Sequence, residues 1–334
     1  MSELKQPLRW GILGTAKIAQ KVRRAIGLDE GSACVGIASR SPEKAAEWGK
    51  VQNVPRSYGG YEALLDDPEI EAVYIPLPPS IHHEWTIRTA EAGKHVLCEK
   101  PLAVNHTQAS EMAAACREHG VQLMDGVMWQ HHPRTKQMIK EIERGALGNL
   151  RRLMSGFSFC WDPLPVENIR LQSELGGGAL LDLGWYCVGC ILWASQKMPT
   201  RVEAHARWFQ EVDCSLNAQL WFENNFHGIF DCGFETTWRK WFELAGTSGS
   251  LVCDDFVAPW SEEKSRFWLH DSQGKATEWA FGREIQEREM IVDFRKLVRG
   301  EIQENSWLAL SLKVQKVCDA LAESARKEQI VELS

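Results

Sequence analysis

The sequence predicts an α/β protein with two domains: residues 1–125 as a doubly wound parallel sheet, and residues 126–334 as an α+β domain with a largely antiparallel open sheet. Short apolar strands alternate with amphipathic helices in the first part, and consecutive strand-like runs followed by helices fill the second. A chain of 334 residues is long enough to give each domain its own core.

The first 125 residues change between strand-like and helix-like segments with a short period. We expect strands at 8–13, 33–38, 72–76, 95–98 and 121–124, and helices at 16–26, 42–50, 81–92 and 105–119. Pro42 supports a helix start, because proline fits the first turn of a helix. This alternation is typical of a parallel sheet with helices on both faces.

The rhythm changes after Asp125. The expected helices lie at 135–144, 178–194, 285–298 and 308–327. Strand-like runs repeat from 201 to 281, such as 219–223, 228–232, 241–245, 251–254 and 266–270. A run of strands closed by helices indicates an α+β domain whose sheet is largely antiparallel.

The composition excludes several classes of protein. A net charge of −7 argues against nucleic acid or an anionic membrane as a partner. The N-terminus lacks the apolar core of a signal peptide, and no apolar run approaches the roughly 20 residues that span a bilayer. We therefore expect a cytoplasmic protein whose ten cysteines are reduced. The single Cys187–Cys190 pair lies in an apolar run, which favours core packing, and no metal is expected.

A glycine turn follows the first strand, within Gly11–Ala19. Against the dinucleotide fingerprint G-x-G-x-x-G, its three positions carry Gly14, Ala16 and Ala19. A tight turn at Gly14 leads into a helix whose N-terminal amides face an anion. The expected cofactor contacts here are Gly14, Thr15, Ala16, Lys17 and Ile18. The alternative is that these small residues serve packing alone.

The second strand ends in Ser39 and Arg40, with Lys44 one turn further on. NAD sites usually place an Asp or Glu here to hold the ribose 2′-hydroxyl. A hydroxyl and a guanidinium suit a 2′-phosphate instead, because arginine grips phosphate with charge-assisted paired bonds. We therefore expect NADP as the cofactor, with NAD as second choice, unless this is only an exposed basic turn.

The strand at 95–98 ends abruptly in Glu99, Lys100 and Pro101. Ligands of open α/β sheets bind at the carboxyl ends of the strands, so a lysine beside a carboxylate there is a candidate for catalysis. We expect Glu99 and Lys100 to contact the cofactor, together with Pro78 and His82 from the neighbouring loop. The alternative for Lys100 is a surface lysine before a turn.

In the second domain, Gly176–Gly178 precede a helix that carries Asp182 and Tyr186. Residues four apart share one helical face, so this acid and phenol form a plausible proton-handling pair. The alternative is a buried tyrosine capped by a nearby acid. The expected substrate contacts are Lys100, Trp129, Arg170, Asp182 and Tyr186.

His95–Pro101, the glycine turn and Gly176–Tyr186 together resemble the glucose-fructose oxidoreductase / inositol dehydrogenase / MocA family over nearly the whole chain. The resemblance implies that Lys100 of the Glu-Lys-Pro motif is catalytic and that Asp182 lies in the active site. Tyr186, where inositol dehydrogenases carry histidine, resembles the branch of glucose-fructose oxidoreductase, NADP-dependent D-xylose dehydrogenase and dimeric dihydrodiol dehydrogenase.

Two positions depart from the family pattern. Pro79 stands where many relatives have asparagine, and Trp129–His132 stands where sugar-oxidising relatives often have an aromatic-Arg pair. The resemblance therefore implies a reaction type and leaves the substrate itself open.

We expect hydride transfer between NADP and the CH–OH group of a sugar, polyol or cyclic diol. Tyr186 would act as the base, its phenol pKa lowered from about 10 by the Lys100 ammonium. Alternatively, Lys100 exchanges the proton and Tyr186 positions it. Two other classes stay open: an NAD-dependent glycoside hydrolase on the same fold, and a dinucleotide-binding sensor without activity.

The first domain would bind the dinucleotide, and the second would bind substrate and mediate oligomerisation. An open antiparallel sheet with two apolar faces needs cover on both. Trp221, Trp238 and Trp241 suggest more aromatic surface than one core requires. We expect a homodimer or homotetramer formed through the outer face of this sheet, as relatives are known to pair.

Overall fold

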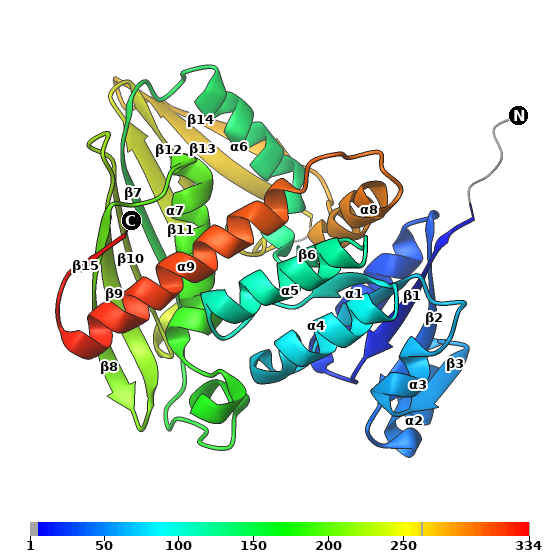
Figure 1. The fold of residues 1–334 in the computed structure, drawn as a ribbon. Coiled ribbons are helices and arrows are strands. Elements are labelled where there is room, and N and C mark those ends of the chain that lie inside the picture. Colours follow the sequence, from blue (N-terminus) through cyan, green and yellow to red (C-terminus); the bar gives the residue numbers. More distant parts are fainter. Residues whose placement is uncertain (1–5, 262, 334) are drawn as a thin grey trace, which may run out of the picture. The chain divides into compact units, whose positions relative to one another are not determined.

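The computed structural model describes residues 6–261 and 263–333, which form two compact units (Figure 1). The first unit contains the chain up to Ala103, Thr107–Met128 and Ile285–Ala309. The second contains Val104–His106, Trp129–Glu284 and the chain from Leu310 onward. The α/β class with a parallel and a largely antiparallel sheet is confirmed.

The first unit is built on a six-stranded parallel sheet of order β3-β2-β1-β4-β5-β6. Its strands are β1 (Leu8–Leu13), β2 (Ser32–Ser39), β3 (Arg56–Gly59), β4 (Ala72–Ile75), β5 (His95–Cys98) and β6 (Leu123–Asp125). Its helices are α1 (Lys17–Leu28), α2 (Pro42–Gln52), α3 (Tyr61–Leu65), α4 (His82–Glu91), α5 (His106–Glu118) and α8 (Gln286–Val298), with a 3₁₀ turn at Pro79–Ile81. The strand order reverses between β1 and β4, and such a switch point creates a crevice at the carboxyl ends of the strands.

Three segments lie in a different unit from the one that the sequence indicated: Val104–His106, residues 126–128 and the long segment Ile285–Ala309. Ile285–Ala309 was expected in the second domain but packs in the first unit. The reason is the apolar face of α8, because Met290, Ile291 and Phe294 are buried in the same core cluster as Trp10. The rings of Trp10 and Phe294 lie 4.9 Å apart, centre to centre.

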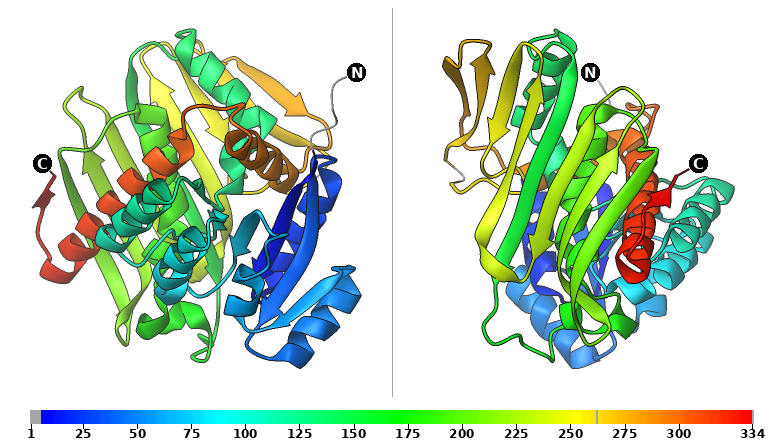
Figure 2. Two further views of the ribbon diagram at one scale, coloured as in Figure 1. Left: turned by 45° about the vertical axis from the view of Figure 1, so that its right-hand side comes forward. Right: turned by 90° about the vertical axis from the view of Figure 1, so that its left-hand side faces the viewer.

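The second unit is built on a nine-stranded sheet of order β14-β13-β12-β11-β7-β10-β9-β8-β15 (Figure 2). Its strands are β7 (Leu150–Cys160), β8 (Arg201–Phe209), β9 (Val212–Trp221), β10 (His227–Gly233), β11 (Glu235–Gly246), β12 (Gly249–Cys253), β13 (Ser265–Asp271), β14 (Ala276–Phe281) and β15 (Val331–Glu332). Among the described strands, β10 and β7 pair in parallel and the other neighbours are antiparallel.

Helices cover one face of this sheet. The helical elements are α6 (Pro133–Glu143), a π-helical turn at Leu180–Gly184, α7 (Trp185–Ser195) and α9 (Ser306–Lys327), which begins in the first unit, with short 3₁₀ turns at Met128–His131, Ile169–Leu171 and Ser173–Leu175. Leu216, Ala218 and Leu220 of β9 point to the buried face, whereas Asn217 and Gln219 are exposed on the other. This alternation is typical of a sheet with one open face.

The segment Ser173–Ser195 corrects the expectation that no apolar run is long enough to cross a membrane. It reaches the required length with a mean hydropathy of 1.5, but 67% of its apolar window is buried inside the protein. The core helix of a protein that packs on a sheet passes the same test, so this segment is weak support for a membrane span.

Candidate active site

The turn between β1 and α1 requires glycine at position 14. Gly14 has a φ of +97°, and a Cβ there would lie 2.9 Å from the Leu77 side chain. Its N–H donates to the Ala38 carbonyl at 2.8 Å, which ties the turn to the end of β2. Ala16 at the helix N-cap makes no side-chain capping bond, so the amides of the first turn of α1 can face an anion.

A cavity of about 280 Å³ lies at the carboxyl ends of β1, β2 and β4. Its lining contains Gly14, Thr15, Ala16, Ser39, Arg40, Lys44 and Pro78, all of which were predicted to contact the cofactor, together with Ser41, Tyr61, Pro76 and Leu77. Lys17 and Ile18 lie in the first turn of α1, outside this lining. The structure thus brings the glycine turn and the basic turn to one cavity.

Two cationic residues and two hydroxyls surround the end of β2. Arg40 donates a hydrogen bond to the Tyr61 hydroxyl, whose pKa is raised by burial despite the opposing charge of Arg40. Ser41 caps α2, because its hydroxyl accepts the N–H of Lys44 at 3.3 Å and donates to the Glu43 carboxylate at 2.7 Å. This arrangement suits a phosphate on the ribose, with Glu43 as the one nearby acid in the described turn.

Tyr61 is a residue that the sequence analysis missed. It begins α3 directly after β3, a short strand that alternates between partly buried and exposed residues. A segment of this kind has no apolar periodicity to reveal it. Its packing against Trp85, edge to face with ring centres 4.8 Å apart, holds it at the cavity wall.

His82 has a different place from the one expected. The ring is fully buried, with Nε2 2.8 Å from the Leu77 carbonyl oxygen and Nδ1 2.9 Å from the Pro101 carbonyl oxygen. Burial lowers the pKa of His82, and the nearby charge of Lys100 acts in the same direction. We therefore correct the expected cofactor contact: both ring nitrogens are used to join the loop after β4 to the loop after β5.

Lys100 and Glu99 follow β5 at the carboxyl edge of the sheet, as the sequence predicted. The buried Glu99 carboxylate accepts a hydrogen bond from the Tyr74 hydroxyl at 2.5 Å. It also accepts the backbone N–H of Lys100 at 3.3 Å. These bonds fix the backbone from which the Lys100 side chain starts, beside the loop that His82 holds.

In the second unit, the glycine-rich segment leads into a π-helical turn before α7. Gly176 and Gly178 have φ values of +78° and +116°, and a Cβ on Gly177 would lie 2.7 Å from the Arg170 carbonyl oxygen. The expected single helix over 178–194 is therefore a π turn at Leu180–Gly184 followed by α7. Single π turns are rare in proteins, and those that occur often lie at functional sites.

Asp182 and Tyr186 lie on this helical segment and each has a defined neighbour. The Nε of Arg170 lies 2.6 Å from Oδ2 of Asp182, so two predicted substrate residues form an ion pair. The Tyr186 ring packs edge-on against Phe157 of β7, with centres 5.4 Å apart. Phe157, which the sequence analysis did not single out, thus supports the phenol from the sheet.

Trp129 is a second correction. Its indole is 1% exposed and packs edge-on against Trp193 and Phe256, with ring centres 5.6 Å apart in both pairs. These are the surroundings of a core side chain, so the expected substrate contact of Trp129 is replaced by a role in the core of the second unit. Within residues 6–261 and 263–333, no group of three or more His, Cys, Asp or Glu is placed to hold a metal ion.

Comparisons with known proteins agree with this geometry. Residues 8–127 match the model of the oxidoreductase family with an NAD-binding Rossmann fold, and residues 135–252 match the GFO/IDH/MocA C-terminal domain. The chain is 30% identical to an NADP-dependent D-xylose 1-dehydrogenase of Haloferax volcanii, over 98% of this chain and 100% of the relative. It is 32% identical to the trans-1,2-dihydrobenzene-1,2-diol dehydrogenase of Mus musculus, over 75% of this chain and 76% of the relative.

A solved structure is similar over nearly the whole chain. A 3-ketoreductase from Actinomadura kijaniata, in complex with NADP and TDP-benzene, has a TM-score of 0.88 at 29% identity and covers 96% of this chain and 98% of its own. The sequence matches and the two sheets lead to one conclusion. This chain is an oxidoreductase that belongs to the Gfo/Idh/MocA family.

Proposed function

We propose that this enzyme transfers a hydride between NADP and the CH–OH group of a sugar, polyol or cyclic diol. The observation that carries the proposal is the cavity where Gly14, Arg40 and Lys44 meet at the carboxyl ends of the strands. A glycine turn with open helix amides suits a pyrophosphate, and the two cations suit a 2′-phosphate. The relatives described above include an NADP-dependent sugar dehydrogenase and a ketoreductase bound to NADP.

The bound nicotinamide would accept or supply the hydride, while residues of this chain would handle the accompanying proton. Lys100 and Tyr186 are the candidates, since an ammonium and a phenol can each exchange a proton with a substrate hydroxyl. Asp182 would orient the substrate or Tyr186, and its ion pair with Arg170 holds the carboxylate in place.

An aromatic surface in the second unit supports a ring-shaped substrate. Phe159 lies two residues after Phe157 on β7, and alternate residues of a strand point to the same face. It packs against Trp161, Phe234 and Trp238, with ring centres 4.7 to 5.6 Å away. The apolar faces of sugar rings and cyclic diols pack on surfaces of this kind. Trp238 therefore lies on the helix-covered face, which corrects its expected place on the outer face.

The test is a panel of aldoses, inositols and cyclic diols with free NADP, followed by the absorbance of NADPH. We expect at least one member to be oxidised with stoichiometric release of NADPH. Cleavage of glycosides without net NADPH would instead indicate the hydrolase class. Dinucleotide binding with no turnover across the panel, in both reaction directions, would indicate a sensor and contradict the proposal.

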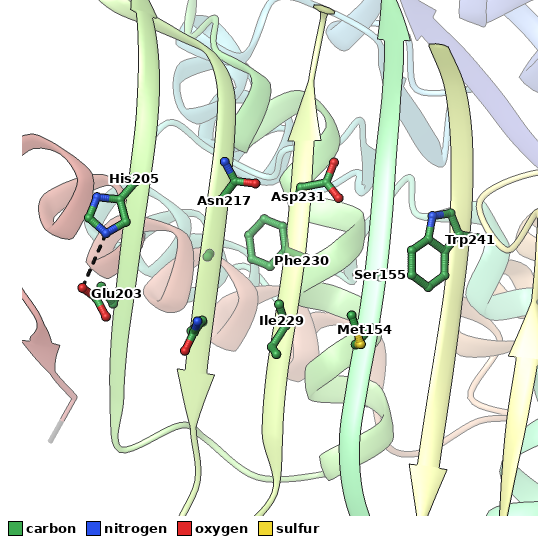
Figure 3. A pocket seen from close by; sticks show the side chains of 11 residues that line it. Met154, Ser155, Glu203, His205, Asn217, Ile229, Phe230, Asp231 and Trp241 are labelled. Carbon is green, nitrogen blue, oxygen red and sulfur yellow. Dashed lines mark ion pairs between the residues drawn. The ribbon is translucent and has the colours of Figure 1, made fainter. Parts of the chain in front are cut away.

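We also propose a cytoplasmic homodimer or homotetramer. The ten cysteines, all within the described residues, are free thiols, as expected in a reducing compartment. For the assembly, the open face of the second sheet carries Met154, Ile229 and Trp241 around a shallow hollow of about 220 Å³ (Figure 3). Apolar side chains on an open sheet face favour pairing with a second copy.

A further inference from the structure

Asp213 of β9 lies against the start of the helical segment that carries Asp182 and Tyr186. Its Oδ2 accepts the backbone N–H of Leu180 at 2.6 Å, and the carboxylate also accepts the N–H of Ala179. A Cβ on Gly178 would fall 2.3 Å from Oδ1, so glycine is needed for this close approach. The acid lies 33 residues away in sequence from the amide that it binds.

The hydrogen bonds to Asp213 replace those that a capping side chain usually makes at the start of a helix. The first amides of a helix have no partner within the helix, and a side-chain oxygen at the N-cap normally accepts one of them. Here Ala179 at the N-cap makes no side-chain capping bond. The acceptor comes instead from a strand of the sheet, and therefore connects the π turn to the framework of the second unit.

We propose that Asp213 is a positioning residue, which holds the first turn of this segment on the sheet and so sets the placement of Asp182 and Tyr186. The kinetic part of this inference rests on the proposed function. The structural part does not, because it concerns the amides of Ala179 and Leu180 alone.

The surroundings of Asp213 make the contact sensitive to pH. Burial raises the pKa of its carboxyl to about 7, although the two backbone N–H bonds and the charge of Arg326 on α9 act in the opposite direction. The other titratable groups that face it are the thiols of Cys214 on β9, Cys232 on β10 and Cys318 on α9. Above pH 7 a carboxylate accepts charge-assisted bonds, whereas below it a neutral acid accepts more weakly.

The first test measures amide hydrogen exchange of the full-length enzyme. In Asp213→Ala we expect the amides of Ala179 and Leu180 to exchange about 10-fold faster or more, because a buried hydrogen bond is lost. Asp213→Asn keeps an acceptor oxygen and should restore most of the protection. The matched control is Asp271→Ala, since Asp271 accepts two backbone N–H groups in the β13–β14 hairpin of the same sheet.

The second test follows kcat and KM against pH. We expect kcat of Asp213→Ala to fall about 10-fold while KM for NADP stays unchanged, and Asp213→Asn to recover most of kcat. The ratio of parent kcat to Asp213→Asn kcat should rise with pH through about 7, because only the parent titrates there.

The outcomes separate the two claims. If amide exchange at Ala179 and Leu180 changes in the variants but the parent oxidises no substrate, the proposed function is wrong. The structural part of the positioning role would still be supported. Unchanged exchange at Ala179 and Leu180 in both variants would overturn the positioning role. If Asp213→Ala does not fold, the comparison of the parent with Asp213→Asn is the test. A ratio of parent kcat to Asp213→Asn kcat that does not change across pH 7 would then contradict the inference.

Discussion

Lys100 is the residue whose removal should affect chemistry most and folding least. Its backbone is fixed by Glu99, while the side chain is partly exposed after β5. We predict that Lys100→Met lowers kcat by about 10²- to 10⁴-fold, because a proton-transfer or electrostatic group is lost. Binding of NADP and the thermal midpoint should stay close to the parent values. Lys140→Met, an exposed lysine on α6, is the control. Equal turnover of Lys100→Met and parent would remove Lys100 from the mechanism.

Arg40 decides the choice of cofactor in our proposal. A 2′-phosphate would meet Arg40 and Lys44 in the cavity, whereas an acid at position 40 would repel it. We predict that Arg40→Asp weakens NADP by roughly 10- to 150-fold per lost charge-assisted bond and leaves NAD unchanged or improved. The measurement is kcat/KM for both cofactors. Arg24→Asp makes the same charge change at an exposed position of α1 and should alter neither value.

A parent enzyme that already prefers NAD would refute this use of Arg40. Retention of NADP preference in Arg40→Asp would have the same meaning, since the basic turn would then be only a solvated surface. The Glu43 carboxylate accepts a hydrogen bond from the Ser41 hydroxyl beside this turn. Its negative charge repels a phosphate and therefore reduces the affinity that Arg40 and Lys44 supply.

At the scale of elements, α8 shows how one ion pair and one apolar face attach a distant helix. Arg295 of α8 binds Asp29, with Nε 2.8 Å from Oδ2, and both residues belong to the first unit. Burial raises the pKa of Asp29, but the hydrogen bonds from Arg295 and Ser32 outweigh it, so the net pKa lies below the ordinary 3.8. A lowered pKa means that the native state favours the carboxylate. Its stabilisation is present above about pH 4 and is lost as the pH falls through the native pKa.

We therefore predict that Asp29→Asn lowers the free energy of unfolding by about 1–3 kcal/mol at pH 7, because a largely buried charged hydrogen bond is lost. The difference between parent and variant should shrink below pH 4. Urea unfolding at both pH values measures it. Glu323→Gln breaks an exposed pair with Lys327 on α9 and should cost about 0.5 kcal/mol or less. An equal effect of Asp29→Asn at pH 7 and pH 3 would exclude the ion pair as its cause.

At the scale of the whole molecule, the open face of the second sheet predicts an assembly. Asp231 and Arg239 form an ion pair on this face among apolar neighbours that include Ile229 and Trp241. We predict that light scattering gives a mass of two or four times 37.9 kDa at micromolar concentration. Ile229→Lys should shift the enzyme toward the monomer, because it places an unpaired charge in the interface. Val166→Lys, at an exposed apolar residue in a loop, should not. A parent mass of 37.9 kDa would contradict the assembly.

The local pattern of the sequence was enough for most elements of the proposed cofactor site, but not for α3, which carries Tyr61. β1, β5 and the glycine turn at Gly14 lie where the apolar runs and the turn residue predicted them. β3 and β14 were missed, because their residues alternate between partly buried and exposed positions without an apolar run. β7 was missed as a whole and β8 was not placed. The start of β7, with Arg151 and Arg152 exposed, shows the same lack of an apolar run, although Leu153 and Phe157 further along are buried. Periodicity reports burial, so it cannot reveal an element that buries little.

By itself, the sequence determined the two kinds of sheet, the family resemblance and the candidate residues, because each follows from neighbours within one turn or one strand. Only the tertiary structure decided which unit contains Ile285–Ala309. It also decided that both ring nitrogens of His82 bond backbone carbonyls and that Asp213 accepts the amide of Leu180. Apart from the short-range His82–Leu77 bond, those contacts and the Arg295–Asp29 pair join positions 19 to more than 250 residues apart. They depend on which apolar faces meet when the chain packs, and no local pattern encodes that choice.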